Sequence, residues 1–210
     1  SIASHLLVCF AMLCTLIFLV RPINVMFIPI VLILVFSNHF SQIKNSIRNL
    51  KVSSILFAGL MSFLLLFPQL LYWKYASGHW LFYAYGNESF SNFFTPQVFK
   101  VLFSTNNGLW VYHPLWLFAS GFAVYAIWKK RIAFYFIGLL FFVMLMICST
   151  WHDPSFGCSY GQRNFVDISC FFAFAFAGLL KEISKINKLA KSALLITIAI
   201  FVLLNLKLIF

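Results

Sequence analysis

Charged side chains are scarce in this sequence. Only 9% of its 210 residues are Asp, Glu, Lys or Arg, and only four are acidic, whereas a soluble domain has about 25% charged residues. Hydrophobic residues make up 63% of the chain. Because so few charges cannot cover a surface that lies mostly in water, these proportions exclude an ordinary soluble domain and predict a polytopic membrane protein.

The sequence also lacks the short motifs of metal and nucleotide sites. It has no H-E-x-x-H, no C-x-x-C and no glycine-rich phosphate loop, so neither a protein-bound zinc nor a nucleotide site is supported. Its five cysteines are an odd number, which argues against a disulfide framework. The net charge of +11 comes from short basic loops between apolar runs, without a basic stripe bearing base-reading groups. We therefore expect no cofactor and no nucleic-acid partner.

Seven apolar segments are predicted to be membrane helices, which gives an all-α transmembrane bundle that forms one domain over residues 1–210. Most approach the length of about 20 residues that a spanning helix needs. They cover residues 2–20, 23–36, 52–73, 114–128, 132–150, 165–180 and 192–210. Residues 74–113 form one long aromatic-rich loop, in which residues 96–104 are predicted to form a short interfacial helix with proline in its first turn.

Basic residues orient these helices. The segments after the second, fourth and sixth helices hold ten of the 15 Lys and Arg residues, and the positive-inside rule places such segments in the cytoplasm. The ten residues are Lys44, Arg48, Lys51, Lys129, Lys130, Arg131, Lys181, Lys185, Lys188 and Lys191. If the short segment 23–36 crosses the membrane, then Arg21, residues 74–113 and the loop 151–167 lie on the outer side.

The loop 151–167 is the predicted site, because it is polar and charged although it lies between two apolar runs. It holds two of the four acidic residues, Asp153 and Asp167, together with His152 and Arg163. Arg163 and Asp167 are four residues apart and can pair on one helix face if the helix begins by residue 164. His152 and Asp153 can form an acid–base pair, since histidine titrates near neutral pH. The structural alternatives are an ion pair where the helix begins and a solvated turn.

Cations and aromatic rings on the outer side suit a phosphate-bearing lipid and a sugar. Arginine can bind phosphate through two parallel hydrogen bonds, and Arg21 lies between two apolar segments, where it contacts phosphate or anchors the topology. Tyr160 and the nearby tryptophans offer flat apolar faces with polar atoms at one edge. Their alternative role is the aromatic belt that membrane proteins place at the interface.

Four motifs occur in order along the chain, at residues 18–22 (FLVRP), 68–78 (PQLLYWKYASG), 108–114 (GLWVYHP) and 156–163 (FGCSYGQR). Together they resemble segments of GT-C type glycosyltransferases, the polytopic membrane enzymes that include the protein mannosyltransferases. The matching motifs of those enzymes are leu-x-Arg-Pro, Pro-Gln-x-x-x-Trp-x-x-x-x-Gly, Gly-Leu-Phe-x-x-x-Pro and Trp-x-Gly-x-x-x-Gly-x-Arg. The resemblance covers most of the chain.

The resemblance implies transfer of a sugar from a polyprenyl-phosphate donor to a glycan, lipid or protein acceptor on the outer side of the membrane. In that family the catalytic carboxylate lies in the first outer loop, so it is expected upstream of Ser1, and the chain is expected to be the inactive C-terminal part. Arg21 and Arg163 would contact the lipid phosphate or the sugar. A divalent metal occurs in some relatives, although no ligand set is visible here. The high Phe, Ile, Asn and Lys content fits a bacterium, which would place the protein in the inner membrane.

Three other functions stay open. A polysaccharide polymerase or ligase would need an outer loop with several arginines, and residues 74–113 contain none. A transporter or channel would need ionisable residues at mid-membrane and paired half-helices, whereas the helix centres here are almost free of charge. A non-catalytic membrane subunit is compatible with the missing catalytic loop.

Overall fold

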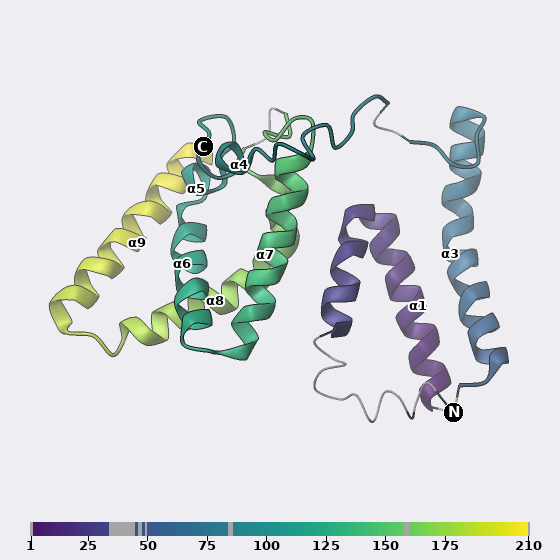
Figure 1. The fold of residues 1–210 in the computed structure, drawn as a ribbon, viewed down its shortest axis with the longest axis horizontal. Helices are drawn as coiled ribbons and strands as arrows, with labels where there is room; N and C mark the ends of the chain where they lie inside the picture. Colours follow the sequence, from purple (N-terminus) through teal and green to yellow (C-terminus); the bar gives the residue numbers. More distant parts are fainter. Residues whose placement is uncertain are drawn as a thin grey trace. The chain divides into compact units, whose positions relative to one another are not determined.

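The computed structural model describes residues 2–33, 45, 48, 50–83, 86–157 and 160–209, and within these residues it contains helices and no strand (Figure 1). The chain forms two compact units, Ser1–Gly86 (unit 1) and Asn87–Phe210 (unit 2). The all-helical prediction is thus confirmed for the described part. Lys44, Cys158, and the end of the predicted segment 23–36 lie outside it.

Unit 1 is built on two long apolar helices, α1 (Ile2–Val20) and α3 (Val52–Ser77), which pack against each other. In the chain between α1 and α3, the 3₁₀ helix η1 (Pro22–Met26) continues as an α-helix over residues 27–33. α1 ends at the predicted place because proline forces the residue before it into an extended conformation, and Arg21 has φ −152° and ψ 105°. α3 runs past Pro68 and ends at Gly78, whose left-handed backbone (φ 77°) closes the helix.

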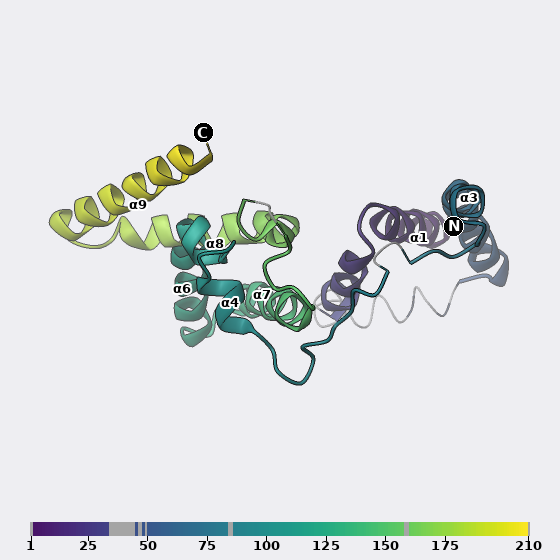
Figure 2. The ribbon, with the colours of Figure 1, turned by 90° about the horizontal axis from the view of Figure 1, so that it is seen from above.

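Among its described residues, unit 2 contains six α-helices, of which two are short, and one 3₁₀ helix. In chain order these are α4 (Val98–Phe103), α5 (Leu109–Tyr112), α6 (Pro114–Trp128), α7 (Ile132–Thr150), η2 (Arg163–Ile168), α8 (Ser169–Ile183) and α9 (Lys188–Ile209). α6 is central because it contacts α7, α8 and α9, and α4 lies beside α7 (Figure 2). Aromatic rings fill the core between them: the ring of Trp116 lies 4.0 Å from Phe172 and 5.6 Å from Phe165.

Three helices of unit 2 have boundaries that differ from the predicted ones. The segment predicted as a helix over 165–180 begins as the 3₁₀ helix η2, and α8 starts at Ser169 and extends to Ile183. The reason is burial of Phe165 and Ile168, which are three residues apart and therefore share one side of a 3₁₀ helix. The last helix starts at Lys188. Pro96 precedes the N-cap of α4, so it is not in the first turn as predicted.

Three helices of the described residues are long and apolar enough to cross a membrane: Val52–Ser77, Ile132–Thr150 and Lys188–Lys207. α6 has 15 residues and is about 22 Å long, which is shorter than the hydrocarbon core of about 30 Å. Ser4–Val20 and Pro22–Ile33 are also shorter apolar helices. The full set of seven spans therefore stays a prediction.

Candidate functional site

Two segments that are distant in the sequence meet at the C-terminal end of α7. Residues 89–97 run antiparallel to residues 149–152, because the backbone N–H of His152 donates to the carbonyl of Ser89 (3.0 Å) and that of Gln97 donates to the carbonyl of Ser149 (2.9 Å). These hydrogen bonds attach part of the aromatic-rich loop to the start of the predicted site. The two segments expected on one side of the protein are therefore in contact within unit 2.

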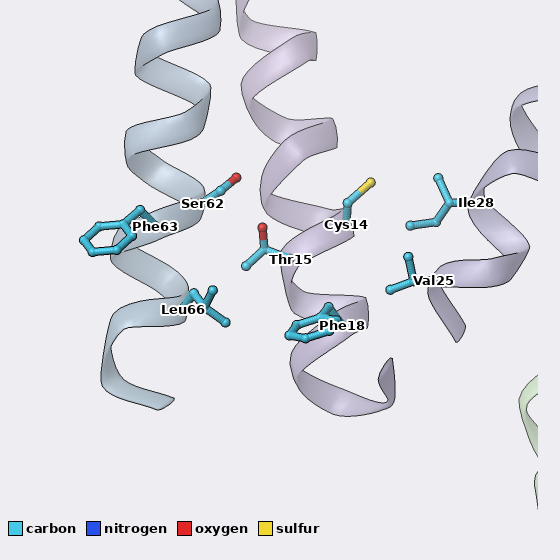
Figure 3. A pocket seen from close by; sticks show the side chains of 8 residues that line it. All are labelled: Cys14, Thr15, Phe18, Val25, Ile28, Ser62, Phe63 and Leu66. Atoms are coloured by element: carbon cyan, nitrogen blue, oxygen red, sulfur yellow. The ribbon is translucent and has the colours of Figure 1, made fainter. Parts of the chain in front are cut away.

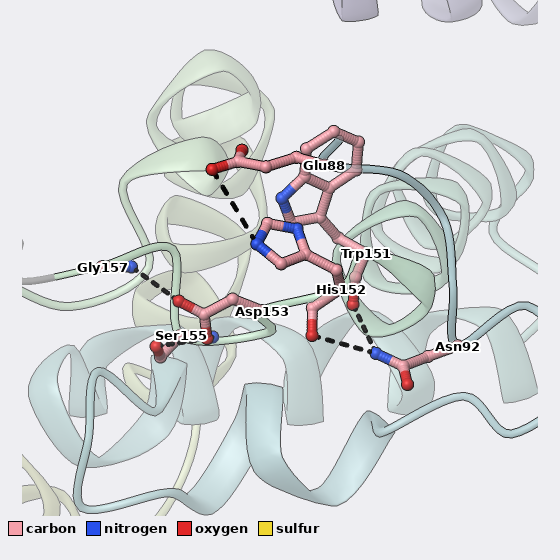
Figure 4. A network of polar contacts seen from close by, with 7 residues as sticks. All are labelled: Glu88, Asn92, Trp151, His152, Asp153, Ser155 and Gly157. Carbon is pink, nitrogen blue, oxygen red and sulfur yellow. Dashed lines mark hydrogen bonds and ion pairs between the residues drawn. The ribbon is translucent and has the colours of Figure 1, made fainter. Parts of the chain in front are cut away.

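Asn92 fixes the backbone at the start of this loop. Its side-chain Nδ2 donates to the carbonyls of Trp151 (2.6 Å) and His152 (3.3 Å) (Figure 4). The Nε2 atom of His152 lies 3.9 Å from a carboxylate oxygen of Glu88. The side chains of Glu88 and His152 are 48% and 36% exposed, so a ligand can reach both. The backbone contacts of Asn92 thus hold a titratable pair at the surface of unit 2.

The carboxylate of Asp153 forms a turn rather than an acid–base pair. It accepts hydrogen bonds from the backbone N–H (2.9 Å) and hydroxyl (2.6 Å) of Ser155 and from the N–H of Gly157 (3.1 Å) (Figure 4). Burial raises the pKa of Asp153, but these hydrogen bonds and the nearby His152 outweigh burial and hold the pKa below its usual value. No hydrogen bond or ion pair joins Asp153 to His152, both of which the structure describes.

Two amide side chains hold the same turn from outside. The Nδ2 atom of Asn107 donates to the carbonyls of Ser155 (3.0 Å) and Gly157 (2.6 Å), and the Nε2 atom of Gln162 donates to the carbonyl of Pro154 (2.8 Å). Asn107 is buried and has a φ of 68°, a left-handed conformation that asparagine adopts more readily than most residues. Residues 153–157 are therefore an ordered loop.

A second cluster, formed by Tyr112, His113, Tyr160, Gly161 and Asn205, lies where α5, the loop and α9 meet. Asn205 donates a hydrogen bond from Nδ2 to the carbonyl of Tyr112. The ring of Tyr160 packs edge-on against Tyr112 (5.2 Å) and His113 (5.5 Å). Gly161 has a φ of 65°, and a Cβ atom there would clash with the His113 imidazole, so this contact requires glycine.

Burial changes the pKa of two members of this second cluster. It lowers the pKa of His113, although a hydrogen bond with the side chain of Asn205 opposes the shift. It raises the pKa of Tyr160, with a smaller contribution from Tyr112. Both side chains are therefore neutral at pH 7, and the cluster anchors α9 to the loop without an ion pair between these residues.

Arg163 and Asp167 do not pair with each other. Both are described, and no ion pair joins them; Arg163 is exposed and Asp167 is half-buried. The prediction assumed α-helical spacing, but both residues lie in the 3₁₀ helix η2, where residues four apart are separated by about 120° around the axis. The guanidinium of Arg163 therefore remains at the surface near the ordered loop. Arg21 belongs to unit 1 and is half-buried before Pro22.

Unit 1 contains an open apolar groove of about 430 Å³ (Figure 3). Cys14, Thr15 and Phe18 of α1 line it, and α3 and the helical segment Pro22–Ile33 supply the rest. The hydroxyl of Thr15 donates to the carbonyl of Ala11 (2.9 Å) within α1, so it offers no hydrogen to an occupant. A groove with this lining fits an apolar chain.

Five residues of unit 2 that the sequence analysis did not assign take part in these clusters: Glu88, Asn92, Asn107, Gln162 and Asn205. Asn205 could have been identified from the sequence, because it is an amide inside an apolar run, where a polar side chain usually makes a specific contact. Asn107 lies in an Asn-Asn-Gly turn, which indicates the backbone shape but not the hydrogen bonds. For Glu88, Asn92 and Gln162 the sequence contains no comparable signal.

Among the described residues, no three His, Cys, Asp or Glu side chains are close enough to hold a metal ion. No protein-family model matches the chain, and no curated protein and no solved structure shows significant similarity to it. The case for a function therefore depends on the motifs and on the geometry of the ordered loop.

Proposed function

We propose that this chain is part of a multi-pass membrane glycosyltransferase. It binds a sugar linked to a polyprenyl phosphate and passes the sugar to a glycan, lipid or protein acceptor on the outer side of a bacterial inner membrane. The observation that carries the proposal is the loop after α7, whose residues 151–157 are held by hydrogen bonds with the side chains of Asn92, Asn107, Asp153 and Gln162. This loop contains a motif similar to that of GT-C type enzymes, and it ends at the exposed cation of Arg163.

The proposed reaction is a substitution at the anomeric carbon of the sugar. An acceptor oxygen forms a bond to this carbon, the bond from the carbon to the phosphate oxygen breaks, and the lipid phosphate leaves with the electron pair. A carboxylate that acts as general base takes the proton of the acceptor hydroxyl. The role of Arg163 is to bind the phosphate, whose negative charge increases as it leaves.

The groove of unit 1 supports a lipid-linked donor. Its lining is almost entirely apolar, and a polyprenyl chain is a long apolar substituent whose burial is favourable by about 0.8 kcal/mol for each CH₂ group. α3, which lines the groove, has the length and composition of a membrane span, and this supports contact between the groove and lipid. A soluble sugar donor has no apolar chain to bind in this groove.

The test is transfer by the intact protein in lipid nanodiscs, measured as release of prenyl phosphate from a prenyl-phospho-hexose. Arg163→Ala should lower the rate about 100-fold, because a charge-assisted hydrogen bond to phosphate contributes up to about 3 kcal/mol. Arg131→Ala is the control, since the guanidinium of Arg131, just before α7, pairs with Glu182 of α8 (2.5 Å) in a partly exposed ion pair and does not belong to the ordered loop.

Two results would count against the proposal. Equal rates for Arg163→Ala and Arg131→Ala would remove Arg163 from the site. Failure of the intact protein to bind or cleave prenyl-phospho-glucose, -mannose and -galactose would refute the proposed donor class.

A further inference from the structure

We propose that the end of unit 2 opposite the ordered loop binds the headgroup of an anionic phospholipid. Two turns form this basic end: residues 128–132, where α6 passes into α7, and residues 181–191, where α8 passes into α9. Both turns lie at the lower end of unit 2 in Figure 1, whereas the ordered loop follows the upper end of α7. The inference does not depend on the proposed function, because it concerns other residues and another ligand.

An ion pair joins the two turns. The Nη2 atom of Arg131 lies 2.5 Å from one carboxylate oxygen of Glu182, and the Nζ atom of Lys185 lies 3.1 Å from the other. The hydrogen bonds from Arg131 and Lys185 hold the pKa of Glu182 below its usual value, so this carboxylate is charged at neutral pH. The two turns contain seven cations and this one acidic residue. Both oxygens of the acidic residue are therefore already engaged.

Five lysines of the basic end have no acidic partner among the described residues. They are Lys129, Lys130, Lys181, Lys188 and Lys191. Lys191 is half-buried and the other four are exposed. The remaining three acidic residues of the chain, Glu88, Asp153 and Asp167, belong to the segments at the other end of α7 and α8. The protein thus leaves a concentrated positive charge at the basic end, which an anion can neutralise.

The stability of the helices does not explain where these lysines lie. The helix dipole favours cations at the C-terminal end of α8, where Lys181 lies, but disfavours them in the first turn of α9, which contains Lys188 and Lys191 and no acidic residue. The positive-inside rule requires cations in this part of the chain but not in the first turn of a helix. An anionic ligand beside that turn would offset the unfavourable interaction, so we expect Lys188 and Lys191 to contact the headgroup.

Exposed apolar side chains between the cations favour a lipid over a soluble anion. Trp128, Ile132 and Leu189 are 74%, 75% and 84% exposed, and each is adjacent in the sequence to a lysine or arginine. Free phosphate or a nucleic acid would leave these side chains in water, whereas a phospholipid carries acyl chains beside its phosphate. Two candidate membrane spans begin here, at Ile132 and at Lys188. The basic end therefore has both the charge and the apolar surface that suit the headgroup level of a membrane.

The test measures lipid binding to the intact protein in a neutral detergent. The probes are phosphatidylglycerol, which is anionic, and phosphatidylcholine, which is zwitterionic, with the same acyl chains and the same fluorescent label. A lysine near anionic lipid contributes about fivefold in affinity, so a headgroup held by Lys188 and Lys191 should give phosphatidylglycerol an advantage of about 25-fold. Lys188→Gln combined with Lys191→Gln should lower this ratio to near one, and Lys188→Arg combined with Lys191→Arg should keep it.

Lys100→Gln combined with Lys207→Gln is the matched control. It removes the same charge from two exposed positions of unit 2, in α4 and in the last turn of α9, and should keep the preference for phosphatidylglycerol. If both pairs of glutamine substitutions lower the preference equally, only net charge matters and the inference is refuted. Equal binding of the two lipids by the wild type also refutes it. Displacement of phosphatidylglycerol by inorganic phosphate, but not by sodium chloride at equal ionic strength, would assign the basic end to free phosphate and overturn the choice of a lipid.

Discussion

Replacing Asn107 should loosen the ordered loop by an amount that the structure predicts. Its Nδ2 atom donates to the carbonyls of Ser155 and Gly157, and each hydrogen bond contributes about 1 kcal/mol to stability. Its φ of 68° adds about 1 kcal/mol of strain for alanine but not for glycine. We therefore expect losses in the free energy of unfolding of about 3 kcal/mol for Asn107→Ala and about 2 kcal/mol for Asn107→Gly.

Asn107→Asp tests the direction of these hydrogen bonds. Aspartate has the same shape but offers acceptor oxygens to two carbonyl oxygens, so it should destabilise more than Asn107→Gly does. The measurement is unfolding of the purified protein in detergent, followed by tryptophan fluorescence. Asn106→Ala is the control, because Asn106 is exposed and such substitutions change stability by less than about 0.5 kcal/mol. If Asn107→Ala unfolds like Asn106→Ala, the two hydrogen bonds do not hold the loop.

Three further changes probe other contacts. Because the pKa of Asp153 is lowered in the folded protein, its contribution to stability is present above about pH 4 and lost as the pH falls further; Asp153→Asn should remove this acid dependence in unfolding measured at several pH values. The pKa of His113 is lowered from 6.5, so stability should fall as the pH drops below 6.5, and His113→Gln should flatten that slope. Gly178→Ala should destabilise the contact between α6 and α8 by about 1–3 kcal/mol, because a Cβ atom there would lie 2.5 Å from the ring of Phe122. Gly121→Ala is the control, since nothing lies within 4 Å of a Cβ atom at that position and the melting temperature should not change. Equal melting temperatures for the two variants would contradict the packing argument.

Hydropathy predicted the helices whose ends are set by local chemistry. α7 was predicted with its bounds correct, because Arg131 precedes it and Trp151-His152-Asp153 follows it, and both are polar breaks in an apolar run. α1 ended as predicted because of Pro22. The start of α8 was wrong because the apolar residues Phe165, Val166 and Ile168 fit either type of helix in the sequence, whereas the burial of Phe165 and Ile168 suits the 3₁₀ geometry.

The candidate site was predictable only as a location. Composition and charge identified the loop after α7, but they could not show which polar side chains would bond to the backbone. The pair Arg163–Asp167 was suggested by spacing along the chain and failed because spacing has meaning only for a known helix type. Asp153 was considered as a base and instead accepts three hydrogen bonds inside its own turn.

The polar residues around the ordered loop therefore divide into two groups with separate physical roles. Asn92, Asn107, Asp153 and Gln162 bond to backbone groups, and in a loop without regular secondary structure such bonds replace the ladder of a helix or strand. Glu88, His152 and Arg163 keep their charged or titratable ends at the surface. A site on a loop binds well only if its support is rigid. Substitutions in the first group should therefore lower the stability of the protein and weaken binding only as a consequence. Substitutions in the second group should weaken binding while the stability stays unchanged.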